Sequence, residues 1–229
     1  IEQAILSKLK AEPFKYDILI CDADPSKRDD LNDGTGRNSK KECVLPDVML
    51  SSLKRINPTI SEGKIKEIVK TLRQDYTGTD IVDTNYKLYR QIRNNIKITI
   101  RRNGKEDFDF VKLLDFEHPE NNTFTVVSQM WIQGKVYYRR PDILIFINGM
   151  PLVFIELKNS IVKVEEAYNK NLKDYMRDIP NLFAFNQICV LFNGLEIKLG
   201  AFNSRYDYFF DWLKIDSEKE KLNRGAILV

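Results

Sequence analysis

Two apolar segments joined by an Asn-Gly pair restrict the fold of this chain more than any other feature. Residues 141–147 read Pro-Asp-Ile-Leu-Ile-Phe-Ile, residues 150–158 read Met-Pro-Leu-Val-Phe-Ile-Glu-Leu-Lys, and Asn148-Gly149 joins them. This pattern predicts a β-hairpin whose strands lie in the core of a sheet. Burying an unpaired charge costs several kcal/mol, so the charged residues at the strand ends need a partner or a function.

The predicted hairpin brings its charged residues together. A three-residue loop over Asn148–Met150 places Asp142 directly across from Glu156, and the period-2 alternation of a strand puts Lys158 on the same face as Glu156. Two facing carboxylates repel each other unless a cation lies between them. The spacing therefore predicts a site for Mg²⁺, with Mn²⁺ as an alternative, that hydrolyses phosphodiesters. Lys158 would orient the attacking water or offset developing negative charge; ordinary solvated charges at two strand ends are the plainer alternative.

Hydrophobic periodicity along the chain predicts an α/β fold, in which a mixed β-sheet is flanked by helices. Helices are expected over residues 1–10, most of 46–93 and 164–177. Strands are expected over residues 16–21, 96–102, 108–115, 123–132, 136–147, 152–157, 187–192 and 195–199. Residues 22–41 are dense in Asp, Lys, Asn and Gly, and we expect a solvated loop there. Because no linker divides the chain, we expect one domain over residues 1–229, with the helical segment 46–93 before the main sheet.

Other polar residues on the predicted helices are candidates for the same site. Glu2 lies beside the apolar positions of the first helix and could approach the metal, or be solvated at the frayed terminus. On the helix after the hairpin, Asn171 and Tyr175 share one face and could bind phosphate or support the metal, although tyrosines there could equally pack in the core. Arg139 and Arg140 precede Asp142 and suit contacts to phosphate.

Composition excludes several classes of site. The net charge of +3 is too small to establish a nucleic-acid partner by itself. The three cysteines are far apart, which argues against a disulfide framework and fits a reducing cytoplasm. His118 is the single histidine, so a two-histidine zinc site is excluded. No apolar run approaches the roughly 20 residues of a membrane span, and we expect no membrane association.

The hairpin resembles the core of PD-(D/E)xK nucleases, and the longer pattern resembles the N-terminal part of type I restriction enzyme R (HsdR) subunits. The strongest match runs from Arg140 to Asn159. Weaker matches lie at residues 36–45, 85–91, 104–116 and 167–183, so the resemblance spans nearly the whole chain. It implies a restriction-endonuclease-like core.

The resemblance also implies roles for individual residues. Asp142, Glu156 and Lys158 match the metal-binding and catalytic residues of that family, and Glu2 fits a glutamate on the first helix that completes the metal site. Tyr175 matches the second residue of a Gln-x-x-x-Tyr motif, whereas Asn171 stands where that family has Gln.

At a larger scale, the resemblance implies a fragment of a subunit that acts on DNA together with methylation (M) and specificity (S) subunits. In such complexes cutting follows ATP-driven translocation. No G-x-x-x-x-G-K-[ST] phosphate loop occurs in this sequence, so ATP would act only through a motor that this chain lacks. Two alternatives remain open from the residues: a free-standing PD-(D/E)xK resolvase or repair nuclease, and a non-catalytic DNA-binding or assembly module.

Overall fold

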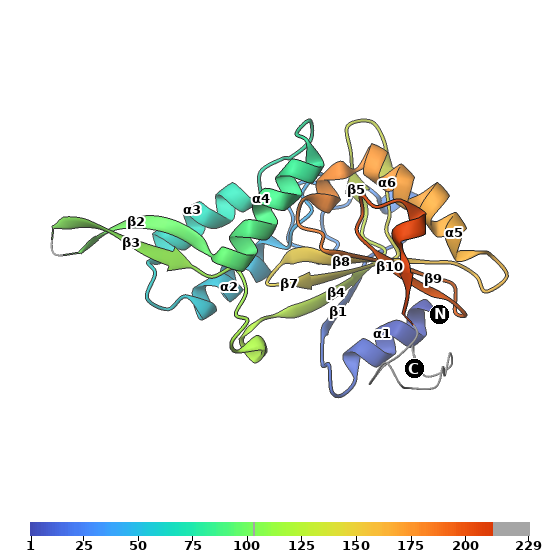
Figure 1. Cartoon of the computed structure of the whole chain (residues 1–229), viewed down its shortest axis with the longest axis horizontal. Helices are drawn as coiled ribbons and strands as arrows, with labels where there is room; N and C mark the ends of the chain where they lie inside the picture. Colours follow the sequence, from blue (N-terminus) through green and yellow to red (C-terminus); the bar gives the residue numbers. More distant parts are fainter. Residues whose placement is uncertain (103, 213–229) are drawn as a thin grey trace.

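The centre of the molecule is a mixed seven-stranded sheet flanked by helices, as the sequence predicts (Figure 1). The computed structural model describes residues 1–102 and 104–212. The strand order is β1-β4-β7-β8-β9-β10-β11; β1 is parallel to β4 and β8 to β9, and the other pairs are antiparallel. The bounds are β1 Asp17–Ile20, β4 Phe124–Ser128, β7 Ile143–Ile147, β8 Met150–Leu157, β9 Ile188–Phe192, β10 Ile197–Gly200 and β11 Phe210–Asp211.

Helices cover both faces of this sheet. Helix α1 (Glu2–Lys10) packs on one face through an apolar cluster that includes Leu6 and Ile155. The segment after the hairpin covers the other face, where Phe154 and Tyr175 share a second cluster (Figure 1). Neighbouring residues of β8 therefore point to opposite faces, as period-2 alternation requires. The covering segment consists of α5 Val164–Glu166, a π-helical turn Ala167–Leu172, α6 Lys173–Asp178 and a 3₁₀ turn Pro180–Ala184.

The helical segment predicted over residues 46–93 is confirmed. It forms α2 (Pro46–Ile56), α3 (Glu62–Leu72) and α4 (Ile81–Asn94). Their apolar faces enclose a third cluster, which also contains Met150 and Leu152 of β8. The turn end of the β7–β8 hairpin is therefore buried among these helices.

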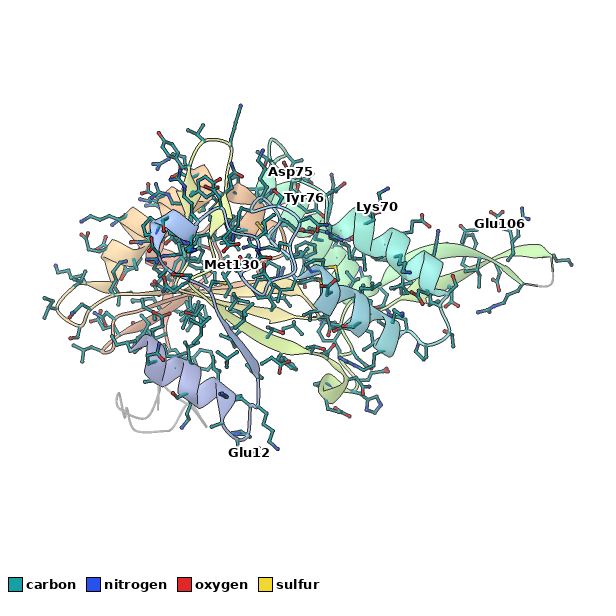
Figure 2. All side chains as sticks on the ribbon, turned by 180° about the vertical axis from the view of Figure 1, so that it is seen from behind. Glu12, Lys70, Asp75, Tyr76, Glu106 and Met130 are labelled. Carbon is teal, nitrogen blue, oxygen red and sulfur yellow. The ribbon has the colours of Figure 1, made fainter. Side chains whose placement is uncertain are left out.

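A two-stranded ribbon of β2 (Ile96–Arg102) and β3 (Lys105–Val111) projects from this helical half, with Glu106 near its tip (Figures 1 and 2). The second strand was expected at 108–115 and instead ends at Val111. The Asn57 side chain bonds both backbone groups of Lys112, accepting from its N–H at 2.8 Å and donating to its carbonyl at 2.9 Å. These contacts divert the backbone from the ladder.

The two long strands expected at 123–132 and 136–147 are each broken. Strand β4 ends at Ser128, because Gln129 adopts a left-handed conformation with φ 59° that an extended strand cannot continue. Beyond the break, β5 (Ile132–Gln133) and β6 (Tyr138–Arg139) form a small separate ribbon. The break directs the residues around position 129 toward the polar end of the hairpin.

The segment Asp22–Lys41 is irregular apart from a 3₁₀ turn at Pro25–Lys27, but it is not solvated throughout as expected. The side chains of Asp33, Arg37 and Lys40 are at most 8% exposed and form ion pairs at 2.8 and 2.6 Å. The charged composition of this segment therefore reflects an internal ion-pair cluster as well as a surface. No helix within residues 1–102 and 104–212 combines the length and apolar character that a membrane crossing requires.

Candidate active site

The turn of the β7–β8 hairpin is fixed by its backbone conformation and by a buried amide. Asn148 and Gly149 have φ values of 49° and 79°, the pair of left-handed residues that a tight hairpin turn requires. The Asn148 side chain is fully buried, donates to the Leu113 carbonyl at 3.0 Å and accepts from the Thr123 N–H at 2.8 Å. The turn position, and with it the register of both strands, is thereby locked.

The register agrees with the expected facing of Asp142 and Glu156, although the loop differs from the expected one. Ile147 pairs with Met150 across a two-residue turn, and a register shift follows between Ile145 and Phe146. Ile143 then pairs with Ile155, and the same register continued by one residue places Asp142 opposite Glu156. The register shift adds one residue to β8, which compensates for the third residue that we expected in the loop. The expected and the observed hairpins therefore both place Asp142 opposite Glu156.

Glu156 is the most deeply buried acidic residue of this group. It is 2% exposed; its Oε1 accepts a hydrogen bond from Lys158 Nζ at 3.1 Å, whereas its Oε2 is buried without a hydrogen-bond partner among the described residues. Burial, together with the nearby Asp142 carboxylate, raises the pKa of Glu156 to about 8. A buried carboxyl oxygen without a partner marks a place where a further positive or donating group would be stabilising.

Asp142 and Glu2 approach each other through an amide that the sequence did not single out. Asp142 Oδ2 accepts from the Leu157 N–H at 2.8 Å, and burial raises the pKa of Asp142. Glu2, at the start of α1, accepts from the Ser128 hydroxyl. Gln129 Nε2 lies 3.1 Å from both Glu2 oxygens and 3.3 Å from Asp142 Oδ1. The sequence signal for Gln129 was a polar pair, Ser-Gln, inside an apolar strand pattern.

Tyr175 approaches this group from the face of the sheet that lies opposite helix α1. Its hydroxyl donates to the Arg140 carbonyl at 3.2 Å; burial and the Glu156 carboxylate raise the pKa of Tyr175, and the phenol in turn opposes the rise in the pKa of Glu156. The amide of Asn171 opposes this shift, which places Asn171 beside the phenol. Asn171 belongs to the π-helical turn Ala167–Leu172; such turns recur at functional sites because they change the direction of side chains within a helix.

The two arginines before Asp142 differ in their contacts. Arg139 pairs with Asp178, at 2.7 Å through Nε, and with Asp174 at 3.4 Å, so its guanidinium holds β6 against α6. Arg140 donates to the Ala23 carbonyl at 2.6 Å and lies 5.1 Å from the centre of the Trp131 ring. Arg139 therefore has a supporting contact in the fold, and the contact of Arg140 with phosphate stays a prediction.

The donor set suits a hard divalent cation. Its acidic members offer only carboxylate oxygens, and Glu156 retains an oxygen without a hydrogen-bond partner in the described part of the chain. Among the described residues, however, no three His, Cys, Asp or Glu side chains form a ready-made metal centre. Glu2 meets Asp142 through Gln129 rather than directly. The arrangement therefore fits an ion held by two carboxylates, with its remaining positions left to water and substrate.

Comparison with known proteins finds a matching family and several similar proteins. The family described as "Type I restriction enzyme R protein N terminus (HSDR_N)" matches residues 1–208. The type I restriction enzyme HindI endonuclease subunit of Haemophilus influenzae is 29% identical over 98% of this chain and 21% of its own length. A protein of Methanocaldococcus jannaschii, provisionally named as the type I restriction enzyme MjaIXP endonuclease subunit, is 34% identical over 80% of this chain and 18% of its own.

A further relative, the type I restriction enzyme SsaAORF53P endonuclease subunit of Staphylococcus saprophyticus, is 28% identical over 56% of this chain. The chain spans about a fifth of the length of the first two relatives, at 18% and 21%. Because the family match covers nearly all of the sequence, including both strands of the hairpin, the chain belongs to the family of type I restriction enzyme R protein N-terminal regions.

Proposed function

We propose that this chain is the Mg²⁺-dependent endonuclease domain of a type I restriction enzyme R subunit and hydrolyses phosphodiester bonds of DNA, with Mn²⁺ as an alternative ion. The observation that carries the proposal is Oε2 of Glu156, which is buried beside Asp142 and Lys158 and has no hydrogen-bond partner within residues 1–102 and 104–212. A carboxyl oxygen buried without a partner, next to a second carboxyl group, is costly for a purely structural hairpin. It is expected where a cation completes the site.

Each charged residue of the site has a proposed role in binding the ion or in catalysis. Asp142 and Glu156 would hold the ion, and Glu2, held by hydrogen bonds from Ser128 and Gln129, would support them. The bound ion would polarise the phosphate and lower the pKa of a water. Lys158, 21% exposed at the edge of the group, would orient that water or offset charge that develops on the phosphate.

Three further residues would support or contact the DNA. Tyr175 of α6 borders Glu156, and Asn171 of the π-helical turn lies beside Tyr175. Arg140, whose guanidinium makes no ion pair among the described residues, is the candidate for a phosphate contact. Arg139 would act indirectly, because its ion pair with Asp178 holds α6, the helix that carries Tyr175, against β6. These roles rest on proximity and on chemical type.

The proposal extends to a larger assembly. Since the relatives are about five times longer, we propose that residues 1–229, with the helical segment 46–93, form one domain of a longer R subunit. Cleavage would follow ATP-driven translocation by a motor outside this region, in a complex with methylation and specificity subunits. Metal binding and DNA cleavage distinguish this proposal from the two alternatives, a free-standing nuclease and a non-catalytic DNA-binding or assembly module.

Titration of the chain with Mg²⁺ or Mn²⁺, followed by calorimetry, tests the metal site. We expect Asp142→Asn and Glu156→Gln to weaken metal binding at least about tenfold, because each replaces a charged carboxylate ligand by a neutral amide of nearly the same shape. The matched control is Glu106→Gln, a carboxylate exposed on the ribbon, which should leave the affinity unchanged. Absence of metal binding by the unsubstituted chain would favour the assembly module.

Cleavage of DNA by the complete enzyme tests the assignment of Lys158. We expect Lys158→Ala to retain metal binding and to lose cleavage, since the lysine offers no ligand to the ion. Full cleavage by Lys158→Ala or Asp142→Ala would contradict the proposed site. Robust cutting by the isolated chain, without ATP or other subunits, would favour the free-standing nuclease.

A further inference from the structure

Gln129 combines an uncommon backbone conformation with three hydrogen bonds to acidic side chains. Its φ of 59° lies in the left-handed region that non-glycine residues rarely adopt. Its backbone N–H donates to the Asp142 carbonyl at 2.9 Å, which holds the residue at the start of the hairpin. Unfavourable conformations of this kind persist where surrounding contacts enforce them, and they cluster at functional sites.

The side chain occupies the space between two carboxylates from remote parts of the chain. Gln129 Nε2 is 3.1 Å from Oε1 and Oε2 of Glu2 and 3.3 Å from Oδ1 of Asp142. An amide NH₂ group is a donor only, so it can satisfy both acceptors, which would otherwise repel each other. Among the described residues, this amide is the group that hydrogen-bonds to both carboxylates.

An incoming ion would compete with only one of the hydrogen bonds that the Gln129 amide donates. A cation bound by Asp142 and Glu156 competes with Gln129 for Asp142 Oδ1, while the bonds to Glu2 and the backbone bond to Asp142 can remain. Glu2 would then stay next to the ion, tied through the same side chain. The link between α1 and the hairpin thus runs through position 129.

We propose that Gln129 is a positioning residue of the metal site: its side-chain amide holds Glu2 and its backbone N–H holds the Asp142 carbonyl, so that the negative charge of Glu2 stays near the ion and contributes to its binding. This inference rests on the proposed function, because it requires Asp142 to bind the ion. It predicts that the contribution of Glu2 depends on Gln129. Groups that orient metal ligands typically change metal affinity by 10–100-fold when they are removed.

A double-mutant cycle in Mn²⁺ affinity tests the dependence. Gln129→Met keeps the length of the side chain and removes its donors. Glu2→Gln keeps the shape of its side chain and removes its charge. We expect each variant alone to weaken Mn²⁺ binding about tenfold, and the double variant to be no weaker than the weaker single variant. A merely structural role for Gln129 would give losses that multiply, and that result would overturn the proposal.

A second variant separates the amide from the backbone. Gln129→Gly also lacks the amide but adopts positive φ without strain, so we expect its Tm to be equal to or above that of Gln129→Met while its Mn²⁺ affinity falls by the same factor. Affinity restored in Gln129→Gly would mean that backbone conformation alone matters, and would contradict the role of the amide.

The two proposals fail in different ways. If Asp142→Asn abolishes Mn²⁺ binding and Gln129→Met binds as the unsubstituted chain does, the tether is wrong and the proposed function stands. If the unsubstituted chain does not bind Mn²⁺, both are wrong.

Discussion

At the scale of single residues, the Glu156 carboxyl group would link proton binding to the proposed metal binding. Its burial beside Asp142 raises its pKa to about 8, so in the ion-free protein it holds a proton near neutral pH. An ion held by Glu156 would require the carboxylate form. Metal binding below that pKa would therefore displace a proton from Glu156.

We expect the apparent Mg²⁺ affinity to rise with pH, approaching tenfold per pH unit below about pH 8 and levelling off above it. The direction follows because the raised pKa favours the protonated form, which competes with the ion. Calorimetry in two buffers with different ionisation heats measures the released proton directly. In Glu156→Gln the proton release near neutral pH should disappear; an unchanged release would contradict the assignment to Glu156.

At the scale of elements, the hairpin was predictable because its signals are local. The Asn148-Gly149 pair marks the turn, and the alternating direction of side chains along each strand determines which residues share a face. The π-helical turn Ala167–Leu172 and the break at Gln129 were not predictable, since each depends on contacts with residues far away in the sequence. The helical periodicity of residues 164–177 predicted a helix there, but it did not predict the π-helical hydrogen bonding within that helix.

The candidate site was predictable to the same extent as these elements. Asp142, Glu156 and Lys158 lie on one hairpin, so local pairing was sufficient to bring them together. Gln129 enters through a tertiary contact with Glu2, which no spacing in the sequence announces. The burial of Arg37 was missed for a related reason, because its partner, the Trp131 carbonyl, is remote in sequence.

The turn offers a test of how strongly the hairpin depends on its glycine. At Gly149 a Cβ atom would lie 2.5 Å from the Leu45 carbonyl oxygen and 2.7 Å from the Met49 nitrogen, with φ at 79°. We expect Gly149→Ala to lower the free energy of unfolding by about 1–3 kcal/mol, measured by urea denaturation. Gly63→Ala is the matched control: it lies in α3 with open space around it and should stabilise the protein by up to about 1 kcal/mol. Equal effects at the two glycines would refute the explanation.

At the scale of the whole molecule, a buried ion-pair cluster fastens the long irregular segment 22–41 to the backbone just before β5. Asp33 pairs with Arg37 and Lys40, and Arg37 also donates to the Trp131 carbonyl at 3.0 Å. Although burial opposes it, the hydrogen bonds from Lys40 and Thr35 lower the pKa of Asp33 to about 2. The cluster therefore joins the segment before α2 to the β5 region.

We expect Asp33→Asn to destabilise the protein by about 3–5 kcal/mol at pH 7, because two buried cations lose their partner. An acid with a lowered pKa contributes stability above its unfolded value, about 3.9, and loses that contribution as pH falls toward about 2. The difference in unfolding free energy between the two proteins should therefore shrink between about pH 4 and pH 2. Urea denaturation across this range measures it, with Glu106→Gln as the exposed control; a constant difference would show that charge at Asp33 is irrelevant.

The compensated register of the β7–β8 hairpin limits which insertions and deletions this region can tolerate. The two-residue turn and the shift between Ile145 and Phe146 together determine that Ile143 pairs with Ile155. One residue gained or lost in β8 would turn Glu156 toward the face of helix α1 and place an apolar neighbour opposite Asp142. Changes of length near the turn are therefore compatible with the site only when a second change elsewhere in the hairpin restores the parity of the strand.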